Sequence, residues 1–249
     1  MTVETIVANI TGNPKEDDKI YDKAGEILRA GGLVAFPTET VYGLGADALD
    51  VKASAKIYAA KGRPSDNPLI VHIADMDALY KLSSEVPKTA LKLAEKFWPG
   101  PLTMILKKSD IVPDSITGGL GTVAIRMPSH KVAAELIRKS GVYIAAPSAN
   151  TSGKPSPTLA SHVIKDLSGK IDMIIADDTV DIGVESTIID LSEEVPAILR
   201  PGYITKEMFE EVIGRVTIDP AITDGVKAGV VPRAPGMKYK HYAPDADLK

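Results

Sequence analysis

The stretch from Leu33 to Ile73 decides the fold, and it reads LVAFPTETVYGLGADALDVKASAKIYAAKGRPSDNPLIVHI. Short apolar runs at residues 33–36 and 69–73 predict two buried strands, and the spacing over residues 51–60 predicts a helix between them. The connecting segments are rich in Thr, Gly, Pro and basic side chains. Because binding residues concentrate on loops held by a rigid scaffold, we expect these loops to form half of an anion-binding cleft. The other half is expected from further along the chain.

Helical and strand-like segments alternate on both sides of this stretch. Helical periodicity predicts helices over residues 20–28, 87–98, 132–138, 159–167 and 206–213. Apolar runs predict strands over residues 103–106, 123–126, 142–146, 173–176, 186–191 and 197–199. This alternation predicts an α/β fold. Residues 186–199 leave no room for a helix between their two strands, so we expect a twisted sheet of mixed parallel and antiparallel strands, flanked by helices.

Residues 1–215 are expected to form one domain, and residues 216–249 a linker arm. The alternating pattern weakens from about Asp219, and residues 225–236 are rich in Gly, Val and Pro. The tail PGMKYKHYAP over residues 235–244 carries aromatic, basic and histidine side chains. This composition is more typical of an arm than of the end of a core.

Composition excludes several classes of protein. The formal net charge of the 249-residue chain is -4, so any nucleic-acid contact must be a local basic patch. The chain contains no cysteine, which excludes a thiol nucleophile and a cysteine metal site. The first residues lack the pattern of a signal peptide, and no apolar run is long enough for a membrane span. A cytoplasmic protein without a membrane association is therefore expected.

Known catalytic motifs are missing as well. The sequence holds no P-loop, no Rossmann glycine fingerprint, no His-Glu-x-x-His motif and no Gly-x-Ser-x-Gly elbow. The histidines lack the spacing of metal ligands, and they are His72, His130, His162 and His241. A zinc enzyme or a covalent hydrolase is not expected.

Basic and hydroxyl side chains at predicted strand and helix ends are the remaining candidates. Lys61 and Arg63 follow a predicted helix and suit a phosphate or carboxylate, although a solvated helix end is the more ordinary interpretation of this motif alone. Ser148 and Asn150 follow a predicted buried strand, at the edge where ligands bind in α/β sheets, or they form a simple turn. His72 lies inside an apolar strand, where a core histidine is the common case.

Two more candidate groups adjoin predicted strands. Arg126 ends one predicted strand, Arg200 directly follows another, and a proline comes soon after each of them, which favours a ligand role modestly. Thr38 begins a segment that is interpreted as a loop, in which Gly43 and Gly45 allow close approach to a ligand. The residues alone thus predict an anion-binding α/β cleft.

Seven sequence blocks, taken together, resemble the YrdC/TsaC family, the threonylcarbamoyl-AMP synthases. The blocks run in order from residue 36 to residue 202, and they are FPTETVYGLG, KGRPSDNPL, FWPGPLT, AIRMP, PSANTSG, ESTI and LRPG. The resemblance implies synthesis of threonylcarbamoyl-AMP from L-threonine, bicarbonate and ATP, with release of pyrophosphate. The product would serve threonylcarbamoylation of the tRNA adenosine next to the anticodon. Such displacement at phosphorus needs positioning and charge neutralisation more than a protein nucleophile.

The resemblance also implies roles for individual residues. It implies a catalytic group around the triphosphate and its Mg²⁺, formed by Lys61, Arg63, Ser148 and Asn150. It implies further nucleotide contacts from Asn67, Thr122, Ser156 and Arg200, with Tyr242 in the arm. It implies an L-threonine site formed by Thr38, His72, Arg126, Ala146 and Ser186. Metal ligands within the protein are not identified.

The arm resembles the interdomain linker of the longer, two-domain form of the family, in which a smaller domain follows. Because the sequence stops at Lys249, that second domain is expected to be absent. Expected partners are the downstream proteins that transfer threonylcarbamoyl to tRNA, and tRNA itself. Two other functions stay open from the sequence, namely a double-stranded RNA or tRNA-binding module and a carbamoyl-transfer domain.

Overall fold

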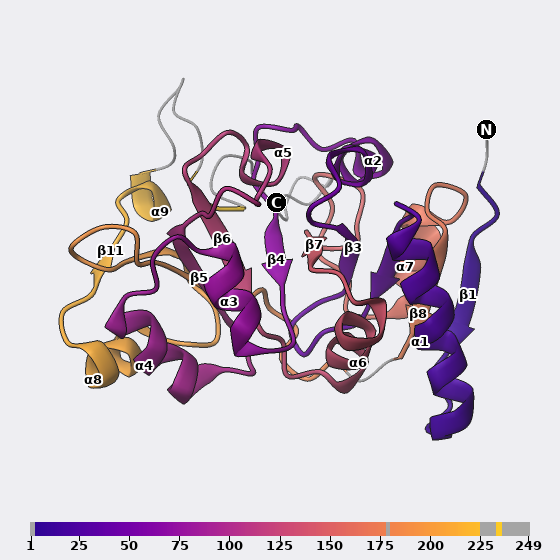
Figure 1. Ribbon diagram of the computed structural model, residues 1–249, viewed down its shortest axis with the longest axis horizontal. Coiled ribbons are helices and arrows are strands. Elements are labelled where there is room, and N and C mark those ends of the chain that lie inside the picture. The colour runs from indigo at the N-terminus through magenta and orange to yellow at the C-terminus, as the bar shows by residue number, and fades with distance from the viewer. Residues whose placement is uncertain (1–2, 178–179, 225–232, 236–249) are drawn as a thin grey trace, which may run out of the picture.

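A single mixed sheet organises the computed structural model, which describes residues 3–177, 180–224 and 233–235 (Figure 1). Within these residues the strand order is β1-β8-β2-β3-β7-β4-β6-β5-β9-β10-β11. The strands are β1 (Ile6–Asn9), β2 (Val34–Phe36), β3 (Gly43–Asp47), β4 (Ile70–His72), β5 (Leu102–Lys107), β6 (Thr122–Arg126), β7 (Ile144–Ala146), β8 (Met173–Ala176), β9 (Thr187–Asp190), β10 (Ala197–Arg200) and β11 (Thr217–Ile218).

Helices flank this sheet as expected. They are α1 (Pro14–Arg29), α2 (Val51–Lys61), α3 (Met76–Leu82), α4 (Lys88–Phe97), α5 (Asp114–Thr117), α6 (Lys131–Ser140), α7 (Ala160–Leu167), α8 (Lys206–Ile213) and α9 (Ala221–Asp224). Within the described ranges, no helix combines the length and the apolar character needed to cross a membrane.

Parallel and antiparallel pairs both occur in the sheet, which confirms the predicted mixed architecture. β4 pairs in parallel with β6 and antiparallel with β7, while β5 pairs antiparallel with β6 and in parallel with β9. β9 and β10 are antiparallel, as the short connection between them requires. The centre of the sheet thus places the ends of β4 and β6 side by side, and the end of β7 beside the start of β4.

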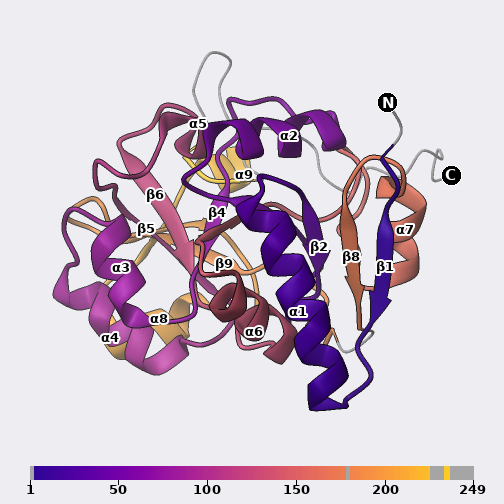
Figure 2. The same ribbon diagram turned by 45° about the vertical axis from the view of Figure 1, so that its right-hand side comes forward.

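The two faces of the sheet are covered unequally. Tyr21 of α1 and Leu136 of α6 pack with Phe36 of β2 in one core cluster, and Figure 2 shows α1 lying across β2 and β8. A larger cluster packs α2, α3, α4 and α7 against other side chains of the sheet. A third, small cluster lies on the face of β4, β5, β6, β9 and β10, and the described helices contribute no side chain to it. Its buried members are Ile70, Ile105, Ala124, Ile188, Leu199 and Ala234.

Side-chain hydrogen bonds cap the N-termini of three helices, α3, α6 and α8. The side chain of Asp75 accepts a hydrogen bond from the backbone N of Ala78 and caps α3. Thr205 caps α8, and His130 caps α6 through Nδ1. Such caps satisfy backbone N–H groups that have no partner within the helix.

The interpretation of Gly43 and Gly45 as loop glycines is wrong. Both lie in β3, which pairs with β2 and β7 in the middle of the sheet. A Cβ at Gly45 would come within 2.6 Å of Ile144 Cγ2 and 2.8 Å of the Phe36 ring. These glycines therefore leave space for the side chain of Phe36. The prediction failed because a short apolar segment with two glycines does not by itself distinguish a strand from a loop.

Two edge strands were not predicted. β1 pairs in parallel with β8, and β11 pairs in parallel with β10. β11 begins at Thr217, so the first residues of the expected arm belong to the sheet. Both strands are short and lie at the edges of the sheet, where the apolar signal is weak because little of the strand is buried.

Candidate active site

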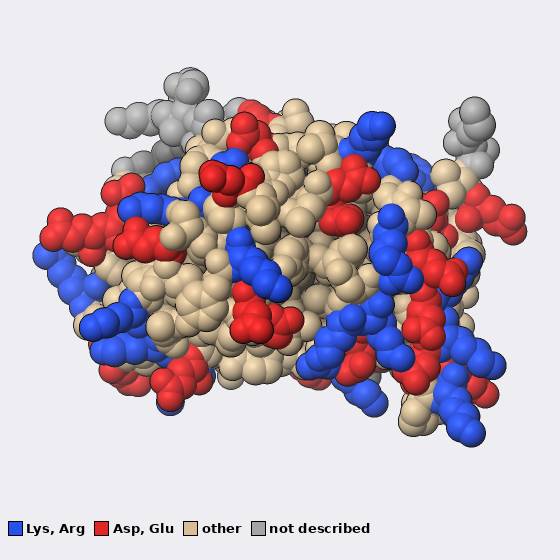
Figure 3. Space-filling view, in the orientation of Figure 1, with Lys and Arg blue, Asp and Glu red and all other residues tan. Residues whose placement is uncertain are grey.

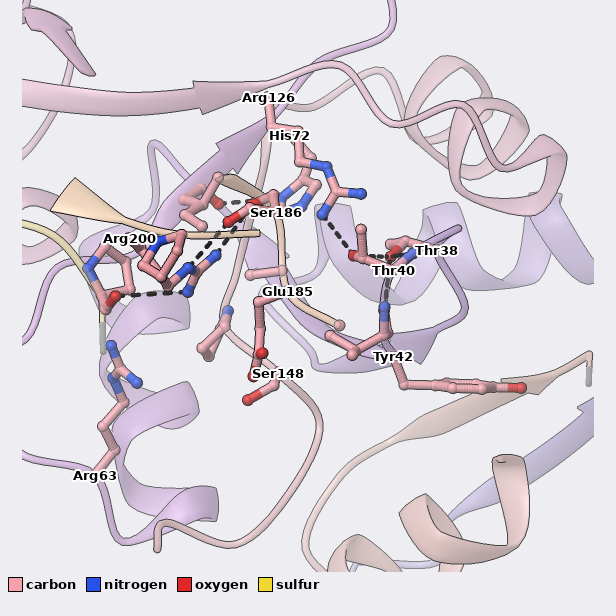
Figure 4. Close-up of a pocket in the computed structure, with 17 residues that line it drawn as sticks. Thr38, Thr40, Tyr42, Arg63, His72, Arg126, Ser148, Glu185, Ser186 and Arg200 are labelled. Carbon is pink, nitrogen blue, oxygen red and sulfur yellow. Dashed lines mark hydrogen bonds between the residues drawn. The ribbon is translucent and has the colours of Figure 1, made fainter. Parts of the chain in front are cut away.

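A cavity of about 370 Å³ opens on the sheet face that the described helices leave free. It is lined by the 38–43 segment, by residues at the ends of β4, β6, β7 and β10, and by Glu185 and Ser186 just before β9; Figure 4 shows these side chains. Its lining includes eight of the residues expected at the site, namely Thr38, Arg63, His72, Arg126, Ala146, Ser148, Ser186 and Arg200. The expected cleft, with one half from the 36–73 stretch and one half from downstream, is thus present.

The Thr38 hydroxyl organises the tight segment after β2. It donates a hydrogen bond to the backbone O of Val41 at 2.7 Å and accepts from the backbone N of Thr40 and of Val41. The Thr38 hydroxyl proton is therefore already used in the hydrogen bond to Val41. In the 2.9 Å contact between the hydroxyls of Thr38 and Thr40, Thr40 is thus the donor. Thr38 shapes the segment, and Thr40 keeps a lone pair for a further donor.

That donor is Arg126, at the end of β6. Its Nη1 donates to Thr40 Oγ1 at 2.9 Å, and its Nη2 forms an ion pair with Glu39 Oε1 at 2.7 Å. Both charged residues are almost fully buried, with 4% and 3% of their surfaces exposed. Burial alone would raise the pKa of Glu39, but the positive charge of Arg126 and its hydrogen bond hold this pKa below the ordinary value. Glu39 and Thr40 therefore hold the guanidinium of Arg126 in one orientation, and Arg126 presents a fixed positive charge to the cavity.

His72 lies beside Arg126 at the end of β4. Its Nδ1 is 3.1 Å from the backbone O of Ile70, and a carbonyl oxygen only accepts, so the ring proton is on Nδ1 and Nε2 carries the lone pair. Burial, together with the charge of Arg126, lowers the pKa of His72 to about 3. His72 is thus a neutral hydrogen-bonding group that lines the cavity, and its interpretation as a plain core histidine does not fit this position.

Arg200 and Ser186 form a second fixed pair. Arg200 donates through Nε to the backbone O of Ser186 and through Nη2 to Ser186 Oγ, both at 3.0 Å. Ser186 Oγ also contacts Thr103 Oγ1 at 2.7 Å, and Arg200 Nη1 reaches the backbone O of Pro235 at 3.5 Å. Burial lowers the pKa of Arg200 to about 10, which leaves the side chain charged at neutral pH.

Lys61 stands behind the wall of the cavity and braces the turn after β7. Its Nζ donates to the backbone O of Ser148 and to that of Asn150, each at 2.5 Å, while Ser148 Oγ donates to Asn150 Oδ1 at 2.6 Å. Only 2% of the Lys61 surface is exposed. Burial, aided by the charge of Arg63, lowers the pKa of Lys61 to about 7. Lys61, Ser148 and Asn150 therefore form one connected unit, of which only Ser148 lines the cavity.

Three described residues that were also expected to contact the nucleotide do not line the cavity, and they are Asn67, Thr122 and Ser156. Arg63 Nη2 donates to the backbone O of Pro68 at 3.0 Å, which ties it to the loop containing the buried Asn67. Thr122 is at the start of β6, opposite Lys107 of β5. Ser156, discussed below, contacts Glu185. Tyr242 lies outside the described residues.

Nine further residues line the cavity that are not in the expected set of site residues, and they include Thr40, Glu185 and Pro235. Ser156 Oγ donates a hydrogen bond to Glu185 Oε1 at 2.6 Å. Pro235 belongs to the expected arm, so one described residue of that segment reaches the site. Local sequence carries little signal for such residues because their role depends on segments that meet only in the folded chain.

Family models match nearly the whole chain. A model described as telomere recombination matches residues 26–202, and a model described as the threonylcarbamoyl-AMP synthase C-terminal domain matches residues 204–249. The boundary that we expected, at residues 215 and 216, remains a prediction.

Curated relatives and a solved structure agree with these matches. A threonylcarbamoyl-AMP synthase of Pyrococcus abyssi is 55% identical over 98% of this chain and 71% of its own length. A threonylcarbamoyl-AMP synthase of Bacillus subtilis is 52% identical over 96% of this chain and 69% of its own. The structure of P. abyssi Sua5 complexed with L-threonine superposes with a TM-score of 0.90 at 52% identity, and covers 98% of this chain and 70% of that one.

Proposed function

The chain belongs to the Sua5/YrdC family, and from this premise we propose that its 370 Å³ cavity is the site of threonylcarbamoyl-AMP synthesis. The chain is a nucleotidyl-transferring enzyme that makes threonylcarbamoyl-AMP from L-threonine, bicarbonate and ATP, and it serves threonylcarbamoylation of tRNA. One observation carries the placement in the cavity. Three arginines, Arg63, Arg126 and Arg200, line this cavity, and the substrates of the enzyme bring three anionic groups to it, namely a triphosphate, a carboxylate and bicarbonate.

The L-threonine subsite is assigned to the Arg126 side of the cavity. The P. abyssi structure was solved with L-threonine, and we take the same amino acid as the substrate here. The guanidinium of Arg126, fixed by Glu39 and Thr40, would receive the substrate carboxylate. His72, Ser186 and the backbone of Ala146 would complete the subsite.

The nucleotide subsite is assigned to the opposite side. Arg63 and Ser148 line the cavity there, and Lys61 and Asn150 support the turn that carries Ser148. In this proposal Arg200 lies between the two subsites, with Asn67, Thr122, Ser156 and Tyr242 as outer contacts. Preorganised cations lower the cost of gathering the negative charges of ATP, bicarbonate and a carboxylate.

The described side chains fit a metal that arrives with the nucleotide. Within the described ranges, no cluster of three or more His, Asp or Glu side chains is placed to hold a metal ion. Mg²⁺ would therefore be held chiefly by the phosphates, with the Ser148 hydroxyl as the nearest protein oxygen of this unit, and would neutralise phosphate charge. The protein residues orient the reactants and stabilise the charge that develops on the departing pyrophosphate.

The steps follow from this arrangement. The threonine amine is carboxylated by bicarbonate, and the resulting carbamate oxygen attacks the α-phosphorus and expels pyrophosphate. Holding the two reactants in one cavity makes the attack effectively unimolecular. The product would pass to downstream tRNA threonylcarbamoyl-transfer proteins. On the face seen in Figure 3, basic and acidic side chains are interspersed, so this face offers no continuous basic track for RNA.

A product assay tests the placement in the cavity. Purified protein is incubated with ATP, Mg²⁺, bicarbonate and L-threonine, each omitted in turn, and threonylcarbamoyl-AMP is measured by mass spectrometry. We expect a product that requires all three substrates and is lost in the variant Arg63→Ala, which retains its fold by circular dichroism. A fully active Arg63→Ala variant would remove this cavity from consideration.

A further inference from the structure

One carboxylate lines the cavity among otherwise basic or neutral side chains. Of the described lining residues, Glu185 alone is acidic, and the charged ones around it are Arg63, Arg126 and Arg200. Figure 4 places Glu185 between the group formed by Arg126 and His72 and the group formed by Ser148 and Arg63. It therefore lies where the proposed threonine and nucleotide subsites meet.

Glu185 is held firmly but keeps one free oxygen. Ser156 Oγ donates to Oε1 at 2.6 Å, and within the described residues no donor reaches Oε2. The backbone at Glu185 is fixed as well, because Gly202 packs so closely that a Cβ there would be 2.6 Å from the Glu185 carbonyl oxygen. A carboxylate that is oriented through one oxygen and open at the other is suited to meet a substrate.

The reaction needs a proton acceptor at this place, an argument that rests on the proposed function. Threonine arrives as an ammonium, and it must lose a proton before its nitrogen can attack bicarbonate. The three arginines carry no lone pair to accept it. Protonation of His72 would place a second positive charge beside Arg126, whereas a carboxylate becomes neutral when it accepts a proton. Lys61 Nζ donates to backbone oxygens behind the wall of the cavity. Glu185 remains.

We propose that Glu185 is a catalytic residue that accepts the proton from the threonine amine. One ammonium proton moves to Glu185 Oε2, and the freed lone pair of the nitrogen forms a bond to the carbon of bicarbonate. The bond from that carbon to its hydroxyl group breaks, and the hydroxyl leaves as water with a second proton from the nitrogen. The products of this step are the carbamate and protonated Glu185. Glu185 then releases its proton to solvent.

The variant Glu185→Gln tests this role, since glutamine keeps the size and the contact with Ser156 but does not take up the proton. In the product assay we expect kcat to fall at least about 100-fold, the usual effect of losing a general base, with the KM for ATP and for threonine changed less than about threefold. The defect should shrink as the pH rises from 7 to 10, because threonine then arrives increasingly as the free amine. The matched variant Ser156→Ala, which loses the hydrogen bond that positions Glu185, should lower kcat about tenfold or less.

Other outcomes would overturn the proposal. An unchanged kcat in Glu185→Gln would remove Glu185 from the chemistry. A raised KM for ATP that excess Mg²⁺ restores would instead make it a ligand of the nucleotide or its metal, and a defect that stays constant up to pH 10 would exclude a base. A wild-type protein that makes no product would overturn the proposed function itself, whereas an active wild type with an equally active Glu185→Gln variant would overturn only the role of Glu185.

Discussion

Arg126 shows how a single side chain is prepared for its ligand. Glu39 and Thr40 bind its terminal nitrogens, and its Nε lies 3.4 Å from the backbone O of Gly100. A buried ion pair adds little net stability by itself, because desolvation offsets much of the attraction. Its value here is orientation, since a guanidinium fixed on three sides can offer its remaining N–H groups only toward the cavity.

The first prediction concerns the substitution Arg126→Lys. An ammonium keeps the charge but not the planar fork, so the KM for threonine should rise about tenfold or more while the KM for ATP stays within about threefold. Steady-state kinetics with each substrate varied separately would measure this. The matched change Arg63→Lys should show the reverse preference. Equal effects of Arg126→Lys on both substrates would contradict the assignment of Arg126 to threonine.

Lys61 is the residue whose protonation should respond to the nucleotide. Its pKa of about 7 lies far below the ordinary 10.5 because the side chain is buried beside Arg63. Between pH 7 and 10.5 the unfolded chain therefore binds a proton that the unliganded fold does not, so the cost of this burial to stability decreases as the pH rises through that window.

The second prediction follows from the charge of the triphosphate. A bound triphosphate should raise the pKa of Lys61, so ATP binding at pH 8 should take up close to one proton. Calorimetric titrations in two buffers of different ionisation enthalpy would measure the uptake. In the variant Lys61→Met this uptake should disappear, provided that its melting curve shows a folded protein. The same uptake in wild type and variant would show that Lys61 does not sense the phosphates.

At the scale of elements, Gly202 fixes the position of the backbone just before β9. A Cβ at Gly202 would be 2.6 Å from the backbone O of Glu185 and 2.6 Å from the backbone N of Thr187. The next turn is anchored too, since Thr187 Oγ1 donates to the backbone O of Ile204 at 2.9 Å. The turn after β10 and the segment before β9 are therefore locked together, and this lock places Glu185 and Ser186 in the cavity.

The third prediction is that Gly202→Ala reduces both stability and activity. Backbone atoms cannot move aside as a flexible side chain would, so we expect a loss of about 1–3 kcal/mol in the free energy of unfolding. The kcat should fall as well, because Glu185 and Ser186 shift with the backbone. Chemical denaturation and the product assay would measure the two effects. The control Gly121→Ala, where a Cβ meets nothing within 4 Å, should be close to neutral.

At the scale of the whole molecule, a short segment far along the chain completes the site. Ala234 is fully buried in the small cluster on the open sheet face, and Pro235 lines the cavity. Arg233 anchors both, because its Nη1 is 3.1 Å from Asp190 Oδ2 and its Nη2 pairs with Asp219. The anchor thus joins β9 and the residue after β11 to the wall of the active site.

The fourth prediction concerns this anchor. Arg233 is 42% exposed, and the buried Asp190 keeps the two hydrogen bonds that Ser192 donates to it, so Arg233→Ala should lower the free energy of unfolding by only about 1 kcal/mol. The KM for ATP or threonine should nevertheless rise by up to about fivefold, because Pro235 would be held less firmly against Arg200. Kinetics and denaturation would measure both quantities. The exposed Arg215→Ala variant is the control, and an unchanged KM in Arg233→Ala would show that the anchor does not serve the site.

The sequence by itself determined the α/β class, the mixed sheet, most central strands and the helix caps. These features depend on local periodicity and on side chains a few residues apart, such as Asp75 with Ala78. The sequence also marked the strand-end residues Arg126, Arg200 and Ser148. It did not predict β3, because the glycines of this strand are selected by the packing of Phe36 and not by any local preference.

Only the tertiary structure decided how these groups work together. Four features of the site depend on partners far away in the chain or on the degree of burial. They are the ion pair of Glu39 with Arg126, the position of the ring proton of His72, the contact of Lys61 with Ser148 and the open oxygen of Glu185. Charge and pKa respond to distance and desolvation in three dimensions, which a linear pattern does not contain. The sequence therefore determined which side chains are available, and the fold decided which of them carry charge, hold a proton or face the substrate.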